Sequence, residues 1–231
     1  MRADVIAIVP AAGSGERFGH DINKAFFEIL GKPVLIWALE IFQRSSLISE
    51  IIPVFSTVDM ERGLEMIEKY SLSKVKKIAP GGEERQFSVL NALNLIDNSS
   101  SIVLIHDAAR PVIDEALIKR CLDMLGKNDG VVCGVPPKDT IKETEGGIVK
   151  RTLNRKYITS VQTPQVFRFK TLSNAFSKIK GEKIEFTDDA AVVEHSGGSI
   201  VVAEGSYRNI KITTPDDAII AESFIKELED K

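Results

Sequence analysis

Residues 5–19 read VIAIVPAAGSGERFG, and this stretch decides the fold. The apolar run from Val5 to Val9 predicts a strand buried on both faces, as in a parallel sheet. The loop that follows is made of small residues, and its glycines let the backbone pass close to a ligand with amides pointing inward. Arg17 and Lys24 add two positive charges beside it. The pattern therefore predicts a loop that binds a triphosphate and neutralises charge that grows on it.

Two familiar phosphate-binding loops do not fit this stretch. A Walker A loop ends in Gly-Lys-Ser/Thr, which is absent here. A dinucleotide fingerprint has the spacing G-x-G-x-x-G, whereas Gly13, Gly15 and Gly19 leave one residue too many. An ordinary Gly-rich turn between a strand and a helix stays open as an alternative at this point.

The composition is that of an ordinary globular protein. The 231 residues are enough for one large domain or two small ones, and 43% of them are hydrophobic and 27% charged. The formal net charge of −3 argues against broad nucleic-acid binding but allows a local cationic pocket. Cys121 and Cys133 lack a metal-type spacing and are expected as reduced thiols of a cytoplasmic protein. The sequence from Met1 predicts no signal peptide, and no apolar run is long enough to cross a membrane.

Strand-like and helical segments alternate after the first loop, which predicts an α/β fold with a mostly parallel sheet covered on both faces. A helix is expected to begin at Pro33, because proline suits a first helical turn. The other predicted strands are 50–55, 75–79, 102–105, 130–135 and 200–203, and other predicted helices are 59–70, 118–125 and a last one ending at 228.

Residues 80–89, PGGEERQFSV, form the second informative stretch. Two glycines at a strand end let the backbone approach a planar ligand closely. A cytosine ring offers an amino donor at N4 and acceptors at O2 and N3, which backbone groups of such a turn can match. A plain strand-to-helix turn, in which Glu83 and Glu84 favour the helix N-terminus, explains the same residues equally well.

Residues 102–111, IVLIHDAARP, end a predicted central strand with the pair His106 and Asp107. Open α/β sheets bind ligands at the carboxyl ends of their strands, and a carboxylate there can accept from ligand hydroxyls or hold a metal. Arg110 lies three positions after Asp107, so a local salt bridge is the alternative. His106 is interpreted as a structural histidine rather than a catalyst.

Residues 138–159 break the α/β alternation. The turn Glu145-Gly146-Gly147-Ile148 between two alternating segments predicts a β-hairpin arm. A two-stranded ribbon is marginal in isolation, so the arm is expected to pack on a second subunit. In the last third of the chain, Thr187 or a neighbouring Asp is expected to cap a helix. Lys211 is expected on a strand, either partly buried beside a phosphate or pointing to water from a sheet edge.

Seven sequence motifs of this chain resemble those of a known family. They are PAAGSGERFG with Lys24, GGEERQFSV, HDAARP, DTIK, QTPQVF, TDDA and NIKITTPDD, and in this order they cover nearly the whole chain. The set resembles the 2-C-methyl-D-erythritol 4-phosphate cytidylyltransferases of the non-mevalonate isoprenoid pathway. Phe18 stands where Met is frequent in that family. The resemblance implies transfer of CMP from CTP to methylerythritol phosphate, with release of pyrophosphate. It also implies one Rossmann-like nucleotidyltransferase domain over 1–231, whose β-arm at about 138–159 builds a homodimer.

The resemblance further implies roles for particular residues. The residues implied in catalysis are Arg17, Lys24, Arg155 and Lys211. Those implied in CTP binding are Ala11, Ala12, Gly13, Gly15, Arg17, Lys24, Gly82, Glu83 and Ser88. Those implied in binding the polyol phosphate are Asp107, Arg110, Thr140, Arg155, Thr163, Thr187 and Lys211. Thr140 and Arg155 would reach the partner subunit's pocket. Mg²⁺ is implied as a cofactor held mainly by the CTP phosphates, with no protein metal ligand.

Two other functions remain as alternatives at this point. A cytidylyltransferase of the same fold that acts on ribitol phosphate would use the same CTP loops, so only a panel of polyol phosphates separates the two. A dinucleotide-dependent oxidoreductase is disfavoured by the glycine spacing and by the lack of an acidic residue at the end of the strand 51–55. Nicotinamide fluorescence titration would test that second alternative.

Overall fold

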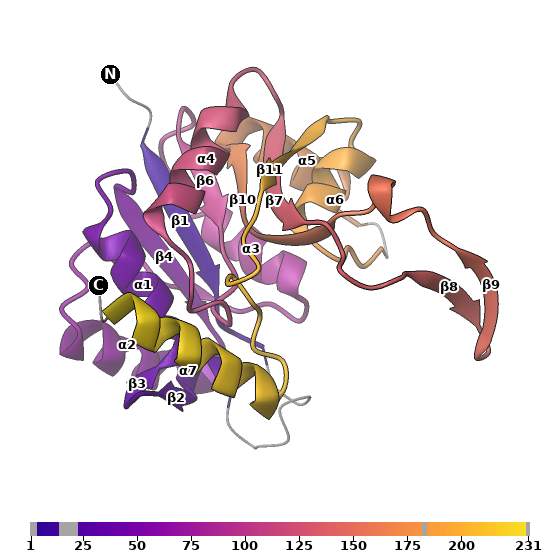
Figure 1. Cartoon of the computed structure of the whole chain (residues 1–231). Helices are drawn as coiled ribbons and strands as arrows, with labels where there is room; N and C mark the ends of the chain where they lie inside the picture. The colour runs from indigo at the N-terminus through magenta and orange to yellow at the C-terminus, as the bar shows by residue number, and fades with distance from the viewer. Residues whose placement is uncertain (1–3, 14–22, 182–183, 230–231) are drawn as a thin grey trace.

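Seven strands form one mixed, mostly parallel sheet in the computed structural model, which describes residues 4–13, 23–181 and 184–229 (Figure 1). The strand order is β11-β7-β10-β6-β1-β4-β5. Only β10 runs antiparallel to its neighbours, β6 and β7, among these described strands. The strands are β1 Val5–Pro10, β4 Glu50–Phe55, β5 Ala79–Pro80, β6 Ile102–Ile105, β7 Gly130–Val135, β10 Ser160–Arg168 and β11 Ile200–Glu204. The predicted fold class is confirmed.

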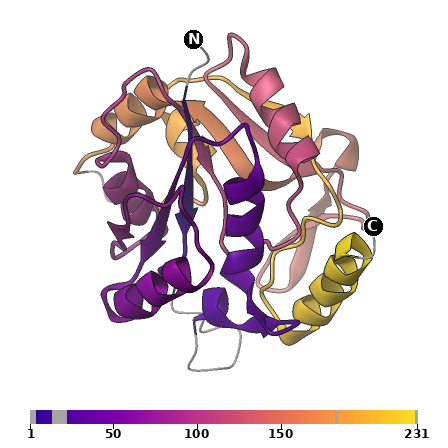
Figure 2. The same cartoon turned by 90° about the vertical axis from the view of Figure 1, so that its left-hand side faces the viewer.

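Helices cover both faces of the sheet (Figure 2). They are α1 Val34–Arg44, α2 Met60–Lys69, α3 Arg85–Leu93, α4 Glu115–Leu125, α5 Phe169–Lys178, α6 Asp189–His195 and α7 Pro215–Glu229. The alternation of side chains along β1 explains the two layers. Val5, Ala7 and Val9 pack in one buried cluster with α1 and α4, whereas Ile6 and Ile8 pack in another with α3, α5 and α6. Both faces of β1 are therefore core.

A third buried cluster attaches the C-terminal helix to the body. Ala221 and Ile225 of α7 pack with Val34 and Trp37 of α1 and with Ile29. Ile29 belongs to a small hairpin, β2 Glu28–Ile29 and β3 Lys32–Pro33. None of the helices within the described ranges is both long and apolar enough to cross a membrane.

The predicted boundaries agree with the structure along most of the sheet. The predicted strands 50–55, 102–105 and 130–135 coincide with β4, β6 and β7, and β11 extends its prediction by one residue. The predicted strand 75–79 is wrong, because only Val75 makes a bridge, to Ile51, and β5 begins at Ala79. Residues 76–78 between them belong to no strand.

Lys211 does not lie on a strand, so the strand predicted around it is wrong. Its segment is a loop attached to the body where the amide of Ile212 donates to the carbonyl of Ala109 at 2.8 Å. Ile212 is buried, but the Lys211 side chain is 41% exposed. The isoleucines therefore anchor the loop without burying the lysine between them. The helix after Thr187 is capped by Asp188, whose carboxylate accepts from the amide of Ala191 at 2.9 Å.

The predicted arm is confirmed as a hairpin that projects from the body (Figure 1). Its strands are β8 Lys142–Glu145 and β9 Ile148–Thr152, and every residue of both strands is exposed. Gly146 and Gly147 form the turn with φ of 57° and 80°, which is the left-handed backbone that glycine adopts without strain. A 3₁₀ turn at Arg155–Tyr157 then leads the chain back into β10.

Candidate active site

A cavity of about 450 Å³ opens beyond the carboxyl ends of β1, β5 and β6. Parallel α/β sheets bind ligands at this edge, because loops that follow neighbouring strands converge there. Three such loops line the cavity: Ala11–Gly13 after β1, Gly82–Arg85 after β5, and Asp107–Ala109 after β6. Lys24 and Lys211 add two amines from elsewhere in the chain.

The first loop and Lys24 are held together by Asn23. The Asn23 amide nitrogen donates to the Ala11 carbonyl at 2.7 Å and to the Asp59 carboxylate at 3.0 Å. Its oxygen caps the 3₁₀ turn Lys24–Phe26 by accepting from the Ala25 amide at 3.1 Å. Asn23 therefore fixes Lys24 beside the small-residue loop, a role that the motif did not reveal. Gly15 and Arg17 lie outside the described residues.

The second loop packs against the first with no room for side chains. A Cβ added to Gly81 would lie 2.6 Å from the Cβ of Ala12, and one added to Gly82 would lie 2.5 Å from the Cβ of Phe87. Ser88 supports the loop from the helix side: its hydroxyl accepts from the Gly82 amide at 3.0 Å and donates to the Glu84 carbonyl at 3.3 Å. Glycine is required here by close approach of backbone segments, which holds main-chain groups rigidly at the cavity wall.

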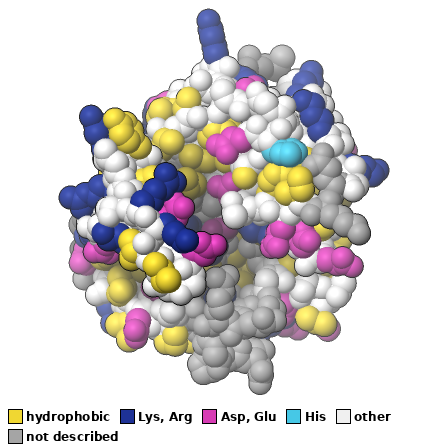
Figure 3. All heavy atoms as spheres, turned by 90° about the vertical axis from the view of Figure 1, so that its right-hand side faces the viewer, with side chains coloured by type: hydrophobic (Ala, Val, Ile, Leu, Met, Phe, Trp, Pro, Cys, Tyr) yellow, Lys and Arg dark blue, Asp and Glu magenta, His cyan; other side chains and the backbone are white. Residues whose placement is uncertain are grey.

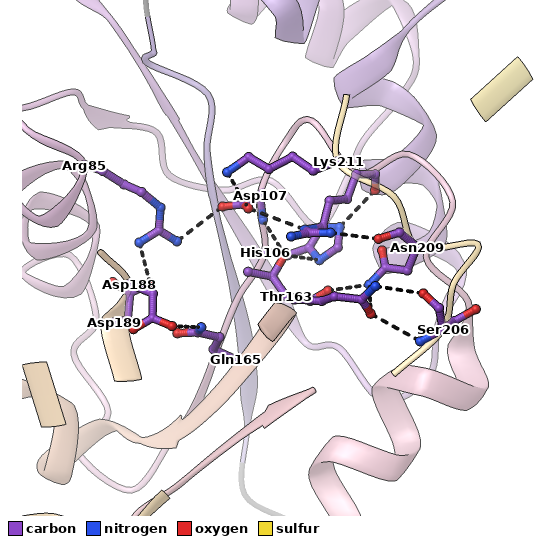
Figure 4. Close-up of polar contacts among 12 residues, drawn as sticks. Arg85, His106, Asp107, Thr163, Gln165, Asp188, Asp189, Ser206, Asn209 and Lys211 are labelled. Carbon is purple, nitrogen blue, oxygen red and sulfur yellow. Dashed lines mark hydrogen bonds and ion pairs between the residues drawn. The ribbon is translucent and has the colours of Figure 1, made fainter. Parts of the chain in front are cut away.

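Asp107 is the centre of a charged cluster (Figure 4). Its carboxylate lies 3.0 Å from the Lys211 amine, 3.3 Å from the Arg85 guanidinium and 3.5 Å from Nε of Arg110. Burial by itself would raise the pKa of Asp107, but the charges of Arg85, Lys211 and Arg110 outweigh it and hold that pKa well below its usual range. The carboxylate is thus ionised throughout the physiological range and is too weak a base to take a proton from substrate.

Arg85 joins this cluster to a second carboxylate. Its guanidinium lies 2.7 Å from Asp189, a residue 1% exposed at the start of α6. Burial raises the pKa of Asp189 despite the neighbouring Arg85 charge. Burial would lower the pKa of Arg85, but Asp189 and Asp107 outweigh that effect and raise it. Sequence reasoning missed Arg85 as a site residue. Its position directly after the glycine turn was the available signal.

The predicted site residues fall into four groups. Those that line the cavity are Ala11, Ala12, Gly13, Lys24, Gly82, Glu83, Ser88, Asp107 and Lys211. Arg110 and Thr163 are buried behind the wall, at 8% and 4% exposure. Thr187 is exposed near the start of α6, and Thr140 and Arg155 are exposed on the arm. Gly15 and Arg17 belong to the undescribed segment. The cavity of one chain thus gathers about half of the predicted residues.

The cavity wall carries charges of both signs. Lys24, Arg85 and Lys211 line the cavity together with Glu83, Glu84 and Asp107. In the cluster around Asp107, the cations Arg85, Arg110 and Lys211 outnumber the carboxylates of Asp107 and Asp189. The outer surface is different: on the side from which the arm projects, cationic and acidic side chains are interspersed (Figure 3). An excess of positive charge is therefore confined to the cluster around Asp107, which the net charge of −3 allows.

The described part of the chain contains no group of side chains suited to hold a metal ion by itself. Among the described residues, no three His, Cys, Asp or Glu side chains are grouped as metal ligands. Both oxygens of Asp107 already face cations, since Arg85 lies at Oδ1 and Lys211 and Arg110 lie at Oδ2. A divalent cation here would need most of its ligands from a bound phosphate.

Comparison with known proteins agrees with this arrangement. The family model for 2-C-methyl-D-erythritol 4-phosphate cytidylyltransferase matches residues 5–227. A cytidylyltransferase of this name from Geotalea uraniireducens is 42% identical over 97% of this chain and 97% of its own length. One from Clostridium acetobutylicum is 44% identical over 96% of this chain and 97% of its own length.

Solved structures show the same likeness. The 4-diphosphocytidyl-2C-methyl-D-erythritol synthase of Anaerococcus prevotii superposes with a TM-score of 0.83 at 32% identity, over 97% of this chain and 99% of its own. The 2-C-methyl-D-erythritol 4-phosphate cytidylyltransferase of Thermus thermophilus superposes with a TM-score of 0.78 at 29% identity, over 98% of this chain and 100% of its own. Sequence and fold therefore agree along the whole chain.

Proposed function

We propose how the residues of this chain share one reaction, on the premise that the chain belongs to the 2-C-methyl-D-erythritol 4-phosphate cytidylyltransferase family. It is a nucleotidyltransferase that uses CTP to form 4-diphosphocytidyl-2-C-methyl-D-erythritol in isoprenoid biosynthesis. The observation that carries the assignment is the cavity in which Lys24, Gly82, Asp107 and Lys211 meet at three strand ends.

CTP occupies the part of the cavity made by the first two loops. Its triphosphate lies on the Ala11–Gly13 backbone beside Lys24, with Arg17 completing the charge, and its base meets the main chain at Gly82 and Glu83. Ser88 supports the ribose side through the Gly82 amide that it binds. Rigid backbone at this wall supports selection of the cytosine edge, because a fixed amide or carbonyl cannot turn to suit uracil.

Methylerythritol phosphate occupies the side of the cavity at Asp107 and Lys211. Asp107 accepts from substrate hydroxyls, Arg110 and Thr163 support that wall, and Lys211 binds the substrate phosphate. An oxygen of that phosphate attacks the α-phosphorus of CTP while the bond to pyrophosphate breaks. No proton must leave the attacking anion, so catalysis consists of bringing two anions together and stabilising the equatorial oxygens, which is the role assigned to Lys24 and Arg17.

Mg²⁺ is expected to bind to the nucleotide rather than to protein side chains. It would be held by the CTP phosphates, where it would supply positive charge to the pyrophosphate oxygens. The chain's own contribution at the triphosphate is the positive charge of Lys24 and Arg17.

The arm supplies the remaining substrate residues to a second copy of the chain. Thr140 and Arg155 are exposed on a projecting ribbon, and Ile148 and Tyr157 are 70% and 77% exposed beside them. A ribbon of this kind gains stability by packing on a two-fold-related copy. We take the rest of the chain as a single nucleotidyltransferase domain. Buried, unpaired Cys121 and Cys133 support a cytoplasmic location for it.

Pyrophosphate release from purified protein tests this proposal. With Mg²⁺ and CTP, methylerythritol phosphate should be turned over and ribitol phosphate should be turned over poorly. CTP should be preferred over UTP by about 5- to 150-fold in kcat/KM, since the wrong base leaves one polar group unpaired at a cost of roughly 1–3 kcal/mol. Equal use of CTP and UTP would contradict the role given to the Gly81–Gly82 loop.

A further inference from the structure

His106 is a fully buried imidazole directly before Asp107. Its Nε2 lies 3.0 Å from the carbonyl oxygen of Arg110, and its Nδ1 lies 3.1 Å from the hydroxyl oxygen of Thr163. The Phe42 ring packs edge-on against it with centroids 5.5 Å apart. Neither ring nitrogen faces the cavity, so the histidine has no direct access to substrate.

The hydrogen bonds around this ring fix its tautomer. A carbonyl oxygen only accepts, so Nε2 must carry the proton that it donates to Arg110. In the neutral ring Nδ1 is then an acceptor, and the Thr163 hydroxyl donates to it. The Thr163 oxygen in turn accepts from the amide of Asp107 at 3.0 Å. The donor and the acceptor of each hydrogen bond between the Asp107 amide and the Arg110 carbonyl are therefore determined.

The same network reaches the segment that carries Lys211. The Asn209 side-chain nitrogen donates to the Thr163 carbonyl at 2.7 Å, and the Arg110 guanidinium donates to the Asn209 carbonyl at 2.8 Å (Figure 4). Three distant segments, 106–110, 163 and 209–211, are thus closed into a ring. The β10–β7 register shifts between Gln162 and Gln165, which lets Thr163 turn its hydroxyl toward His106 instead of continuing the ladder.

We propose that His106, as a neutral imidazole, is a positioning residue for polyol phosphate binding, and that it acts by holding the Thr163 hydroxyl against the amide of Asp107. The proposal rests on the assignment of Asp107 and Lys211 to the polyol phosphate. Thr163 is 4% exposed, its hydroxyl hydrogen points to His106, and its oxygen accepts from the amide of Asp107. The pair therefore sets the backbone of the Asp107 loop from behind.

The environment of His106 keeps the ring neutral. Burial is the largest influence and lowers the pKa of His106 to about 4, although the Arg110 carbonyl and the Asp107 charge oppose that effect. The Arg110 charge acts in the same direction as burial. Protonation would place a second donor against the Thr163 hydroxyl, so the neutral form is the one that the network requires.

A double-mutant cycle with His106→Phe and Thr163→Val tests the proposal. Phenylalanine keeps the ring but removes both hydrogen bonds, and valine keeps the shape of threonine but removes its hydroxyl. Each change should raise the KM for methylerythritol phosphate about 10-fold, while the Kd for CTP, from calorimetry on the same protein, should stay within about twofold. Because the two residues act through one contact, the double variant should be no worse than the single ones.

Further variants keep the result decisive if His106→Phe folds poorly. His106→Asn places an acceptor near the position of Nδ1 and should retain part of the Thr163 contact, giving a KM between wild type and Thr163→Val. His195→Phe, an exposed histidine at the end of α6, serves as the matched control and should leave the KM unchanged. Thermal unfolding should show every variant folded at the assay temperature.

Additive effects of the two substitutions would mean that Thr163 and His106 act independently of each other, and would overturn the proposal. An equal loss of CTP affinity would also overturn it, since that points to general loosening of the fold. Asp107→Asn separates this failure from failure of the assigned function. If Asp107→Asn raises the KM for methylerythritol phosphate and His106→Phe does not, only the positioning role is wrong. If neither raises it, the substrate assignment is wrong as well.

Discussion

Two regions of the molecule carry the residues assigned to the polyol phosphate, and they hold them in opposite ways. In the body, Asp107 and Arg110 are at most 9% exposed and are tied to Arg85, Lys211 and Asn209 by ion pairs and hydrogen bonds. On the arm, Thr140 and Arg155 are exposed. The site residues of the body are held in place by contacts within their own chain. The arm residues make few such contacts.

The contacts of Arg155 illustrate this difference. Its guanidinium donates to the Lys138 carbonyl at 2.7 Å, which folds it against the base of the arm rather than into the cavity of its own chain. The neighbouring Tyr157 and Val161 are 77% and 43% exposed. An arginine held this way, beside uncovered apolar side chains, suits a surface that a second chain completes. The residues of the body therefore form their part of the site within one chain, whereas the residues of the arm need a second chain to complete theirs.

A mixed-dimer experiment should have the largest effect, because it switches activity on. A Lys24→Ala chain and an Arg155→Ala chain are combined at a methylerythritol phosphate concentration where neither homodimer turns over measurably. If Arg155 serves the partner's cavity, one of the two sites in each mixed dimer collects both defects and the other is intact. Pyrophosphate release should therefore recover to about half the wild-type rate per mixed dimer.

Two controls make that recovery interpretable. Distinct affinity tags on the two chains show that mixed dimers form and allow their isolation. Combining Lys24→Ala with Asp107→Asn should give no recovery, since both residues line the cavity of one chain and no site in the mixed dimer is intact. Mixed dimers of Lys24→Ala and Arg155→Ala that stay inactive would place Arg155 in its own chain's site.

Buried and exposed ion pairs should differ in what they contribute to stability. Arg85 and Asp189 are 2.7 Å apart with the carboxylate 1% exposed, whereas Arg151 and Glu143 on the arm are 2.6 Å apart and 69% and 48% exposed. Asp189→Asn should lower the free energy of unfolding by about 1–3 kcal/mol, because it weakens the charged hydrogen bond to Arg85, which keeps its contact with Asp107. Glu143→Gln should cost about 0–1 kcal/mol. Urea unfolding at one protein concentration measures both, and equal losses would contradict the contrast.

The parts of the fold that local sequence determines were predicted well. Strands β4, β6 and β7 are runs of apolar residues bounded by polar ones, and the arm turn is fixed by Gly146 and Gly147. The loop of Lys211 was misassigned because its apolar neighbours imitate a strand, whereas the segment is held by the backbone bond of Ile212 to Ala109 and by side-chain contacts of Asn209 and Lys211. The local pattern of apolar residues predicts which side chains are buried, but it does not show whether a neighbouring strand is available for pairing.

The site was predicted where a motif and a strand end coincide, as at Ala11, Gly82 and Asp107. Arg85 was missed because its role depends on Asp189, a residue 104 positions away. His106 was correctly interpreted as structural, but its link to Thr163 across 57 positions could not be read from either residue alone. Contacts between distant segments arise from sheet order, and the sequence pattern does not state that order.

The last comparison sets one cation of the body against one of the arm. Lys24 lies at the cavity wall beside the proposed triphosphate loop, where negative charge grows on the equatorial oxygens only in the transition state. Lys24→Ala should therefore lower kcat by about 10²–10³ while the Kd for CTP changes much less. Arg17→Ala is predicted to behave alike. Arg155→Ala should instead act mainly on the KM for methylerythritol phosphate, because it binds a ground-state anion delivered by the second chain. Lys119→Ala, an exposed α4 lysine paired with Asp123 at 2.5 Å, is the matched control and should leave both constants unchanged. Steady-state kinetics with calorimetric CTP binding separates these outcomes. A Lys24→Ala enzyme with normal kcat and weakened CTP binding would show that the body, too, contributes binding rather than transition-state stabilisation.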